Sequence, residues 1–331
     1  MQATLAVTVP FFALVLLGYV AARRELLPDA AVPGLNAYVL YFALPCMLFR
    51  FGSSLPIRQL IDPLLIAIWA VSALCVIALT IVLTLRRAGR PGGVGMTDAA
   101  FGALVAAFPN SGFMGVPLLL ELLGAYAAGP VISTLLIDLV LTSTVCLALA
   151  QARVHGGHME TSLLHSAARA LRGAAANPLP YAIALGAVAA ATGQRLVGPV
   201  ERVVFMLADS ATPVALFTIG AVLWRAGRHA HTRTPPRHYL PVALIKLFVH
   251  PLVVFVVGHI AVATGAPVSR SGMTALVLAA ALPSASNVSL LAERYGADNG
   301  RVARIIMAST VLAFGSFSLL AWLLGSGVLR R

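Results

Sequence analysis

The chain is a succession of about ten apolar stretches, most of them about 20 residues long, joined by short polar connections. A helix of about 20 apolar residues crosses the hydrocarbon core of a bilayer. The residues are 60% hydrophobic and 10% charged, whereas soluble domains are about 45–50% apolar and about 25% charged. The pattern therefore predicts an all-α polytopic membrane protein. The expected crossings are residues 5–22, 34–53, 62–85, 98–123, 130–150, 174–192, 199–223, 238–264, 271–293 and 301–326.

The arginines predict the orientation of these crossings. Connections after the first, third, fifth, seventh and ninth crossings hold fifteen arginines, and those after the even crossings hold four. Basic residues gather in cytoplasmic loops, so we expect both termini to be non-cytoplasmic and the protein to lie in the cell inner (plasma) membrane. The net charge of +12 is explained by these loops, and no nucleic-acid partner is expected.

Two internal matches indicate an inverted repeat. Both Pro45–Gly52 and Pro213–Gly220 read P-x-x-L-F-x-x-G, 168 residues apart, and Pro109 and Pro283 follow similar apolar runs, 174 residues apart. Because five crossings per half is an odd number, the second half would be inserted upside down, as in many carriers. We expect residues 1–150 to form one five-helix repeat, 151–173 a cytoplasmic linker and 174–331 the second repeat.

The fourth and ninth apolar stretches are interrupted by proline and polar residues. Proline removes a backbone donor, and an unpaired backbone group in lipid is tolerated only next to protein or a watery cavity. Such breaks in corresponding segments point to a substrate site, whose half-helix amides and side chains could hold an anion or sodium; the simpler role is capping of the half-helices. The candidate substrate-binding residues are Pro109, Asn110, Ser111, Gly112, Pro283, Ser284, Ser286 and Asn287.

Four ionisable residues lie inside the expected crossings: Asp138, Asp209, Lys246 and His250. A charged side chain at the bilayer centre costs about 2.5–3.5 kcal/mol on insertion scales, so it should face a cavity, a partner or an ion. One interpretation makes Asp138 or Asp209 a site for a coupling proton or Na⁺, with Lys246 or His250 as its partner. The other is a buried polar pair that holds helices together.

The motifs at these places resemble the auxin efflux carrier family, which includes bacterial malonate-transporter-like permeases and the plant PIN carriers. The resemblance rests on residues 36–45, 110–118, 281–287 and 292–296. It implies a fold similar to bile-acid/sodium symporters, with helices 1, 2, 6 and 7 as a scaffold and helices 3–5 and 8–10 as a moving transport domain. It also implies that substrate binds where helices 4 and 9 cross, at Pro109, Asn110, Pro283 and Asn287.

The predicted function is secondary transport of a small organic anion, a mono- or dicarboxylate, by an elevator-type motion. The alternative is a receptor or channel of the same fold. No enzyme is expected, because motifs such as H-E-x-x-H and G-x-S-x-G are missing. We expect no metal and no cofactor apart from a coupling proton or Na⁺. The expected partners are the anion, the bilayer and a second copy bound through the scaffold helices.

Overall fold

A computed structural model describes residues 2–54, 62–85, 94–151, 177–194, 196–228 and 234–328, together with a few positions between 154 and 175. Helices dominate these ranges, and one small hairpin pairs β1 (Val154–His155) with β2 (His158–Met159). Most of the linker expected over residues 151–173 lies outside the described residues.

Seven helical stretches of the described chain are long and apolar enough to cross a membrane. They are Thr4–Arg23, Ala31–Ser54, Pro63–Leu85, Ala128–Gln151, Gly198–Arg225, Pro236–Ala263 and Asn299–Leu324. Each coincides with one of the expected crossings, and the prediction of a polytopic, all-helical membrane protein is confirmed. The three remaining expected crossings are shorter or broken helices.

The first half of the chain contains helices that are apolar on most sides. Three of its crossings contain a π-helical turn, a feature that often marks functional sites. The elements are α1 (Gln2–Arg23), α2 (Ala31–Tyr38), η1 (Val39–Ala43), α3 (Leu44–Ser54), α5 (Pro63–Leu85), α6 (Met96–Ala107), η2 (Ser111–Gly115), α7 (Val116–Leu123), η3 (Ala125–Ala127), α8 (Ala128–Ile137), η4 (Asp138–Thr142) and α9 (Ser143–Gln151).

The second half follows the same plan, with a π-helical turn in its third crossing and a break in its fourth. Asn177 starts this half by accepting a hydrogen bond from the backbone of Leu179, which caps the first helix. The elements are α11 (Pro178–Thr192), α12 (Gly198–Arg228), α13 (Pro236–Leu244), η5 (Ile245–Val249), α14 (His250–Ala263), α15 (Arg270–Ala280), α16 (Val288–Arg294) and α17 (Asn299–Val328).

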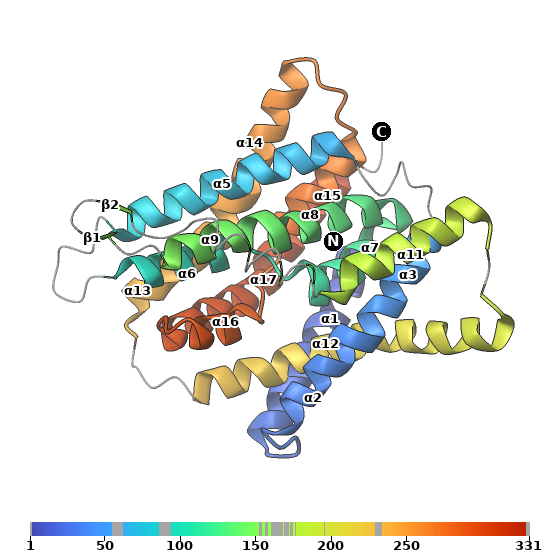
Figure 1. The fold of residues 1–331 in the computed structure, drawn as a ribbon, viewed down its shortest axis with the longest axis horizontal. Helices are drawn as coiled ribbons and strands as arrows, with labels where there is room; N and C mark the ends of the chain where they lie inside the picture. The colour runs from blue at the N-terminus through green and yellow to red at the C-terminus, as the bar shows by residue number, and fades with distance from the viewer. Residues whose placement is uncertain are drawn as a thin grey trace.

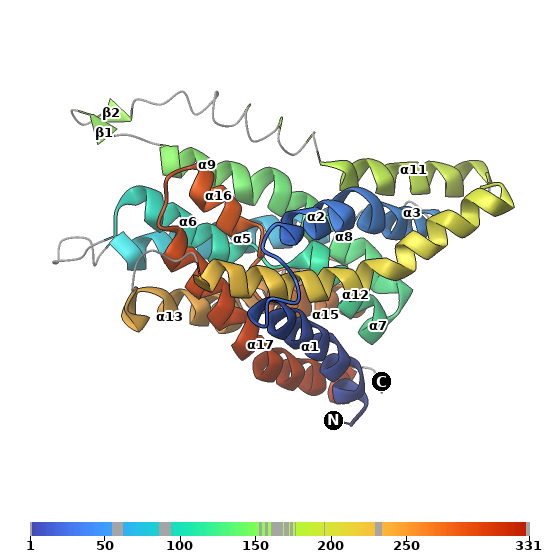
Figure 2. The ribbon, with the colours of Figure 1, turned by 90° about the horizontal axis from the view of Figure 1, so that it is seen from below.

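The helices assemble into two groups (Figures 1 and 2). In the first group α1 lies along α12, α3 lies along α11, and α12 also packs on α3. In the second group α5 packs on α6 and α14, α6 packs on α9, and α14 packs on α15. We call these the scaffold group and the crossover group.

The scaffold group is held together by two close helix crossings at glycine. A Cβ added at Gly220 would collide with the backbone carbonyl of Val15, and one added at Gly18 would collide with that of Phe217. Helices in lipid associate by such close backbone approach at small residues. The α1–α12 contact therefore depends on both glycines.

The α3–α11 contact repeats this arrangement residue for residue. A Cβ at Gly52 would meet the carbonyl of Ile183, and one at Gly186 would meet the carbonyl of Phe49. Each of these four residues lies 168 positions from its counterpart in the α1–α12 contact, the offset of the two P-x-x-L-F-x-x-G motifs. The two motifs thus serve the same packing role in the two halves.

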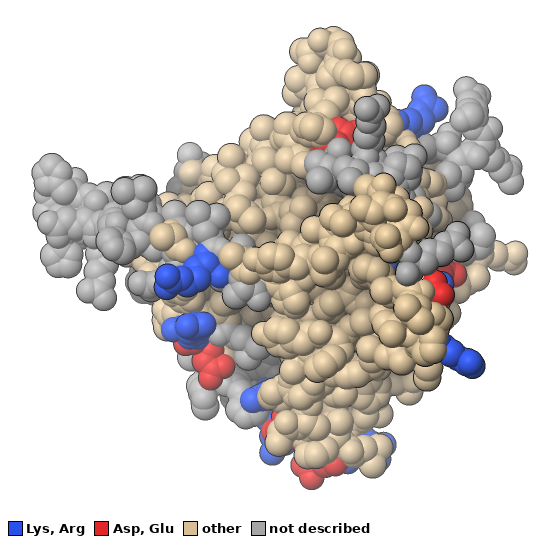
Figure 3. Space-filling model, turned by 45° about the vertical axis from the view of Figure 1, so that its right-hand side comes forward, with Lys and Arg blue, Asp and Glu red and all other residues tan. Residues whose placement is uncertain are grey.

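Charged residues are sparse over much of one face of the molecule. Figure 3 shows Lys, Arg, Asp and Glu near the edges of one face, with a broad uncharged area between them. Large hydrophobic side chains such as Leu17, Met206 and Val311 are exposed, at 58%, 67% and 67%. Contiguous exposed apolar surface of this kind marks contact with membrane or protein, which agrees with the membrane-spanning helices.

Candidate functional site

The breaks of the two interrupted helices meet in the interior of the protein. Pro109 and Ser284 form an antiparallel bridge. The amide of Asn110 donates to the carbonyl of Pro283 at 2.8 Å, and the amide of Ala285 donates to the carbonyl of Phe108 at 3.0 Å. Each break therefore satisfies backbone groups of the other, which is the condition for non-helical backbone at this depth. We call this pair of breaks the crossover.

Side chains fix the crossover in place. Ser284 donates its hydroxyl to the carbonyl of Val105 at 2.7 Å, and its amide donates to the hydroxyl of Ser309 at 3.2 Å. Thr134 approaches the hydroxyl of Ser111 at 3.5 Å. Ser284 therefore joins α6, α17 and the break before α16, and this hydroxyl has a structural partner.

The two asparagines occupy different environments. Asn110 is 4% exposed, whereas Asn287 is exposed and lies in the wall of a cavity. Neither side chain accepts a capping hydrogen bond from the helix that follows it. The capping role considered from the sequence is therefore not seen for either asparagine, and both amides are available for other partners.

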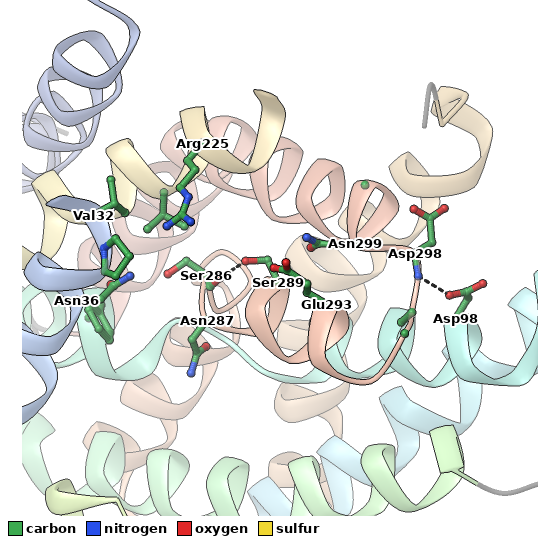
Figure 4. A pocket seen from close by; sticks show the side chains of 16 residues that line it. Val32, Asn36, Asp98, Arg225, Ser286, Asn287, Ser289, Glu293, Asp298 and Asn299 are labelled. Carbon is green, nitrogen blue, oxygen red and sulfur yellow. Dashed lines mark hydrogen bonds between the residues drawn. The ribbon is translucent and has the colours of Figure 1, made fainter. Parts of the chain in front are cut away.

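A cavity of about 730 Å³ lies between the scaffold group and the crossover (Figure 4). The scaffold side of its wall includes Asn36 of α2 and Arg225 of α12, and the other side includes Phe113, Ser286 and Asn287. α12 belongs to the scaffold group, and α2 packs on α12. The cavity is thus bounded by the two helix groups, with the crossover at its wall.

Of the residues predicted for substrate binding, Ser286 and Asn287 line this cavity. The others are buried in or next to the crossover: Pro109, Asn110, Ser111, Gly112, Pro283 and Ser284. The structure thus gathers all eight at one place. Their role in binding stays a prediction.

A buried polar cluster lies in the crossover group, away from the cavity wall. Asp138 at the start of η4 accepts hydrogen bonds at 3.0 Å from the indole of Trp69 and at 3.0 Å from the hydroxyl of Thr142. Both bonds go to Oδ1, and Oδ2 is buried without a hydrogen-bond partner. An unpartnered carboxylate oxygen at full burial is costly and needs a functional or structural reason.

Lys246 connects this cluster to the crossover. Its ammonium donates to the carbonyl of Ala280 at 2.6 Å and lies 3.1 Å from Nδ1 of His250. The ring of Trp69, which donates to Asp138, lies 5.1 Å from the ring of His250, whereas Lys246 and Asp138 form no ion pair within 4.0 Å. Ala280 is the last residue of α15, whose carboxyl end favours a cation. Asp138, Lys246 and His250 thus lie in one buried region beside the crossover, and their joint role in binding a coupling ion stays a prediction.

Asp209 lies elsewhere. Its carboxylate forms an ion pair with Arg50 at 2.9 Å, and the two side chains are 71% and 44% exposed. The pair joins α12 to α3 within the scaffold group. The sequence did not pair Asp209 with Arg50, because 159 residues separate them.

Sequence reasoning did not select three residues that the structure brings to these sites: Trp69, Thr142 and Arg225. Trp69 and Thr142 hold Asp138, and the spacing of Asp138 and Thr142 by four residues was a usable signal, because residues four apart in a helix are neighbours. Arg225 was counted only among the loop arginines that set the orientation.

Broken, mutually bonded helices beside a cavity in a multi-pass protein are typical of a membrane transporter. Comparison with known proteins gives the same class: residues 4–323 match the family described as "Membrane transport protein". The chain belongs to this family, the auxin efflux carriers, which confirms the resemblance seen in the motifs. It is 30% identical over 322 residues to the "Putative malonate transporter" of Rhizobium meliloti (strain 1021), covering 97% of this chain and 95% of that protein. The chain is a transporter rather than an enzyme.

Proposed function

We propose that this protein is a secondary transporter of a small organic anion, a mono- or dicarboxylate such as malonate. The observation that carries the proposal is the crossover at the wall of the 730 Å³ cavity. The name of the Rhizobium meliloti relative, "Putative malonate transporter", supports a small carboxylate as the substrate.

The crossover offers an anion neutral donors and a helix terminus. The helix formed by η2 and α7 begins at Ser111, and its second and third residues are Gly112 and Phe113. Amides in the first turn of a helix lack intrahelical acceptors and carry partial positive charge. Phe113, Ser286 and Asn287 line the cavity, so a carboxylate there would meet this helix terminus and the neutral amide of Asn287.

The two helix groups suggest how the anion would cross. In an elevator-type motion the crossover group, helices 3–5 and 8–10, would slide along the scaffold and carry the anion with it. The equivalent glycine contacts, 168 residues apart, support two inverted five-helix repeats, and such repeats give a carrier two related conformations. Charged residues of the scaffold group and of the crossover group line opposite sides of the cavity. This arrangement fits one of the two end states of the motion, with the cavity open between the two groups.

The cluster around Asp138 is the proposed site of coupling. Asp138 has an unpartnered, buried carboxylate oxygen, and Lys246 ties the cluster to the last carbonyl of α15. A proton or Na⁺ that binds Asp138 would change the charge next to the crossover. Binding of the coupling ion would thereby affect the helix that carries the substrate.

The proposal also covers the orientation in the membrane, the side to which the cavity opens and the packing of a second copy. The protein lies in the inner membrane with both termini non-cytoplasmic, on the basis of the arginine distribution. The cavity then opens towards the cytoplasm, because Asp298 and Gly300 in its wall belong to a connection on that side. A second copy would pack against the scaffold helices, where Leu185 and Val203 are 63% and 57% exposed.

Uptake by liposomes that contain the purified protein tests the proposal. We expect saturable uptake of radiolabelled malonate or succinate that is accelerated by the same anion inside the liposomes. A carrier shows this exchange. A channel would pass the anion without saturation or trans-acceleration, and a receptor would bind it without uptake, so either result would refute transport by alternating access.

A further inference from the structure

We propose that Arg225 binds the second carboxylate of the substrate and so makes the site selective for dicarboxylates over monocarboxylates. This inference rests on the proposed function, since it concerns the same cavity. Arg225 lies in the last turn of α12, in the scaffold group. Its side chain points into the cavity on the side of Asn36 and Ser286 (Figure 4).

Charge is distributed unequally along the cavity. Arg225 lies at the end next to the crossover, whereas Asp98 and Asp298 lie at the opposite end and Glu293 lies between them (Figure 4). A dianion in this cavity is therefore attracted towards Arg225 and repelled from the acidic end. This arrangement favours a position of the dianion beside the crossover.

The acidic end has a compensating partner of its own. Arg301 is 3% exposed, donates to the backbone carbonyl of Asp98 at 2.7 Å and attracts the carboxylates of both Asp98 and Asp298. Asp298 in turn accepts a hydrogen bond from the amide of Arg301 at 2.9 Å. Asp98 and Asp298 are thus held in a structural network with Arg301.

The chemistry of the two walls differs, and this difference gives selectivity. Ser286 and Asn287 supply neutral groups that can hold one carboxylate. The guanidinium of Arg225 carries five N–H donors in a planar fork that matches a carboxylate, enough to serve a substrate as well as a contact within the protein. A monocarboxylate can use only one wall, whereas a dicarboxylate bridges both.

The same helix provides a matched control. Arg228 lies one turn further along α12, outside the cavity wall, and contacts Asp29 at 3.8 Å and Glu25 at 4.0 Å. Its substitution removes the same charge from the same helix end. An effect that arises only from the overall charge of α12 would appear in both variants.

The test measures binding of malonate, succinate, acetate and propionate to purified full-length protein by titration calorimetry. The wild type should prefer the two dicarboxylates. Arg225→Gln should weaken dicarboxylate binding about tenfold to a hundredfold, as expected for a hydrogen bond between charged groups, and change monocarboxylate binding less than threefold. Arg228→Gln should behave as the wild type, and Arg225→Lys, which keeps the charge without the fork, should retain part of the preference.

Two outcomes would overturn the inference while leaving the proposed function intact. One is a wild type that binds acetate as tightly as malonate, and the other is an Arg225→Gln protein that loses both classes equally. If Arg225→Gln does not fold, a full dicarboxylate preference in Arg225→Lys would still contradict recognition by the fork. Failure of the wild type to bind any of the four acids would refute the proposed function and this inference together.

Discussion

Replacement of Asn287 by aspartate should impair anion binding more than replacement by alanine. Asn287 is exposed in the cavity wall and does not cap α16. The two substitutions therefore separate the roles that an asparagine can play at this position. Alanine removes a neutral donor, whereas aspartate keeps the size and adds a negative charge beside the bound carboxylate.

The expected magnitudes differ enough to measure. A neutral hydrogen bond contributes about 0.5–1.5 kcal/mol, so Asn287→Ala should weaken binding about twofold to twelvefold. Two like charges about 6 Å apart repel each other by roughly 0.7 kcal/mol at the dielectric of water and by roughly 2.8 kcal/mol at an effective dielectric of about 20. Asn287→Asp adds this repulsion to the lost donor, which gives a total loss of about tenfold to a thousandfold.

Calorimetric titration of malonate into each folded variant measures these losses. The repulsive part should shrink at high salt, because the exposed charge is screened, whereas the loss in the alanine variant should depend less on salt. An aspartate variant that binds like the wild type, beside an alanine variant that fails, would refute the reasoning. It would assign Asn287 a capping role, since aspartate caps helices well.

Three other predictions follow from the described contacts. Asp138→Asn should fold and still bind malonate but lose the acceleration of uptake by an ion gradient, whereas Asp209→Asn, at an exposed ion pair, should keep it; gradient-driven uptake at wild-type rate in Asp138→Asn would disprove the coupling role. Gly220→Ala should destabilise the protein by about 1–3 kcal/mol through overpacking, whereas Gly34→Ala, with no atom within 4 Å of the added Cβ, should not; equal melting temperatures in detergent would contradict the packing account. Reporter fusions in the connection after residue 151 should report the cytoplasm and fusions to Arg331 the opposite side, and a reversed pattern would overturn the predicted orientation.

Much of the fold was predictable because membrane crossings depend on apolar length. The interruptions at Pro109 and Pro283 were also predictable, since proline and polar residues in an apolar segment identify a broken helix directly. What the sequence could not give is the pairing of the breaks, in which Asn110 bonds to Pro283 across 173 residues. Such a bond depends on how whole helices pack, and no local pattern encodes it.

The environments of the acidic residues within the apolar segments could not be predicted from the sequence either. Asp138 and Asp209 look alike in the sequence, as single acids within apolar segments. One is buried and bonded to Trp69, and the other is exposed and paired with Arg50. The difference arises from which side of each helix faces the protein, and helices that are apolar on most sides carry too little periodicity to show it.

The central claim is that the crossover is exposed alternately to the two sides of the membrane. The accessibility of a cysteine introduced in place of Ser286 tests it. Ser286 lines the cavity and is 6% exposed, and Ser286→Cys exchanges one atom in a protein whose Cys46, Cys75 and Cys146 have been replaced by serine or alanine. In oriented vesicles, a membrane-impermeant thiol reagent applied to either side should react with the introduced thiol, and malonate should protect it from both sides. Reaction from one side only, with or without substrate and an ion gradient, would contradict alternating access.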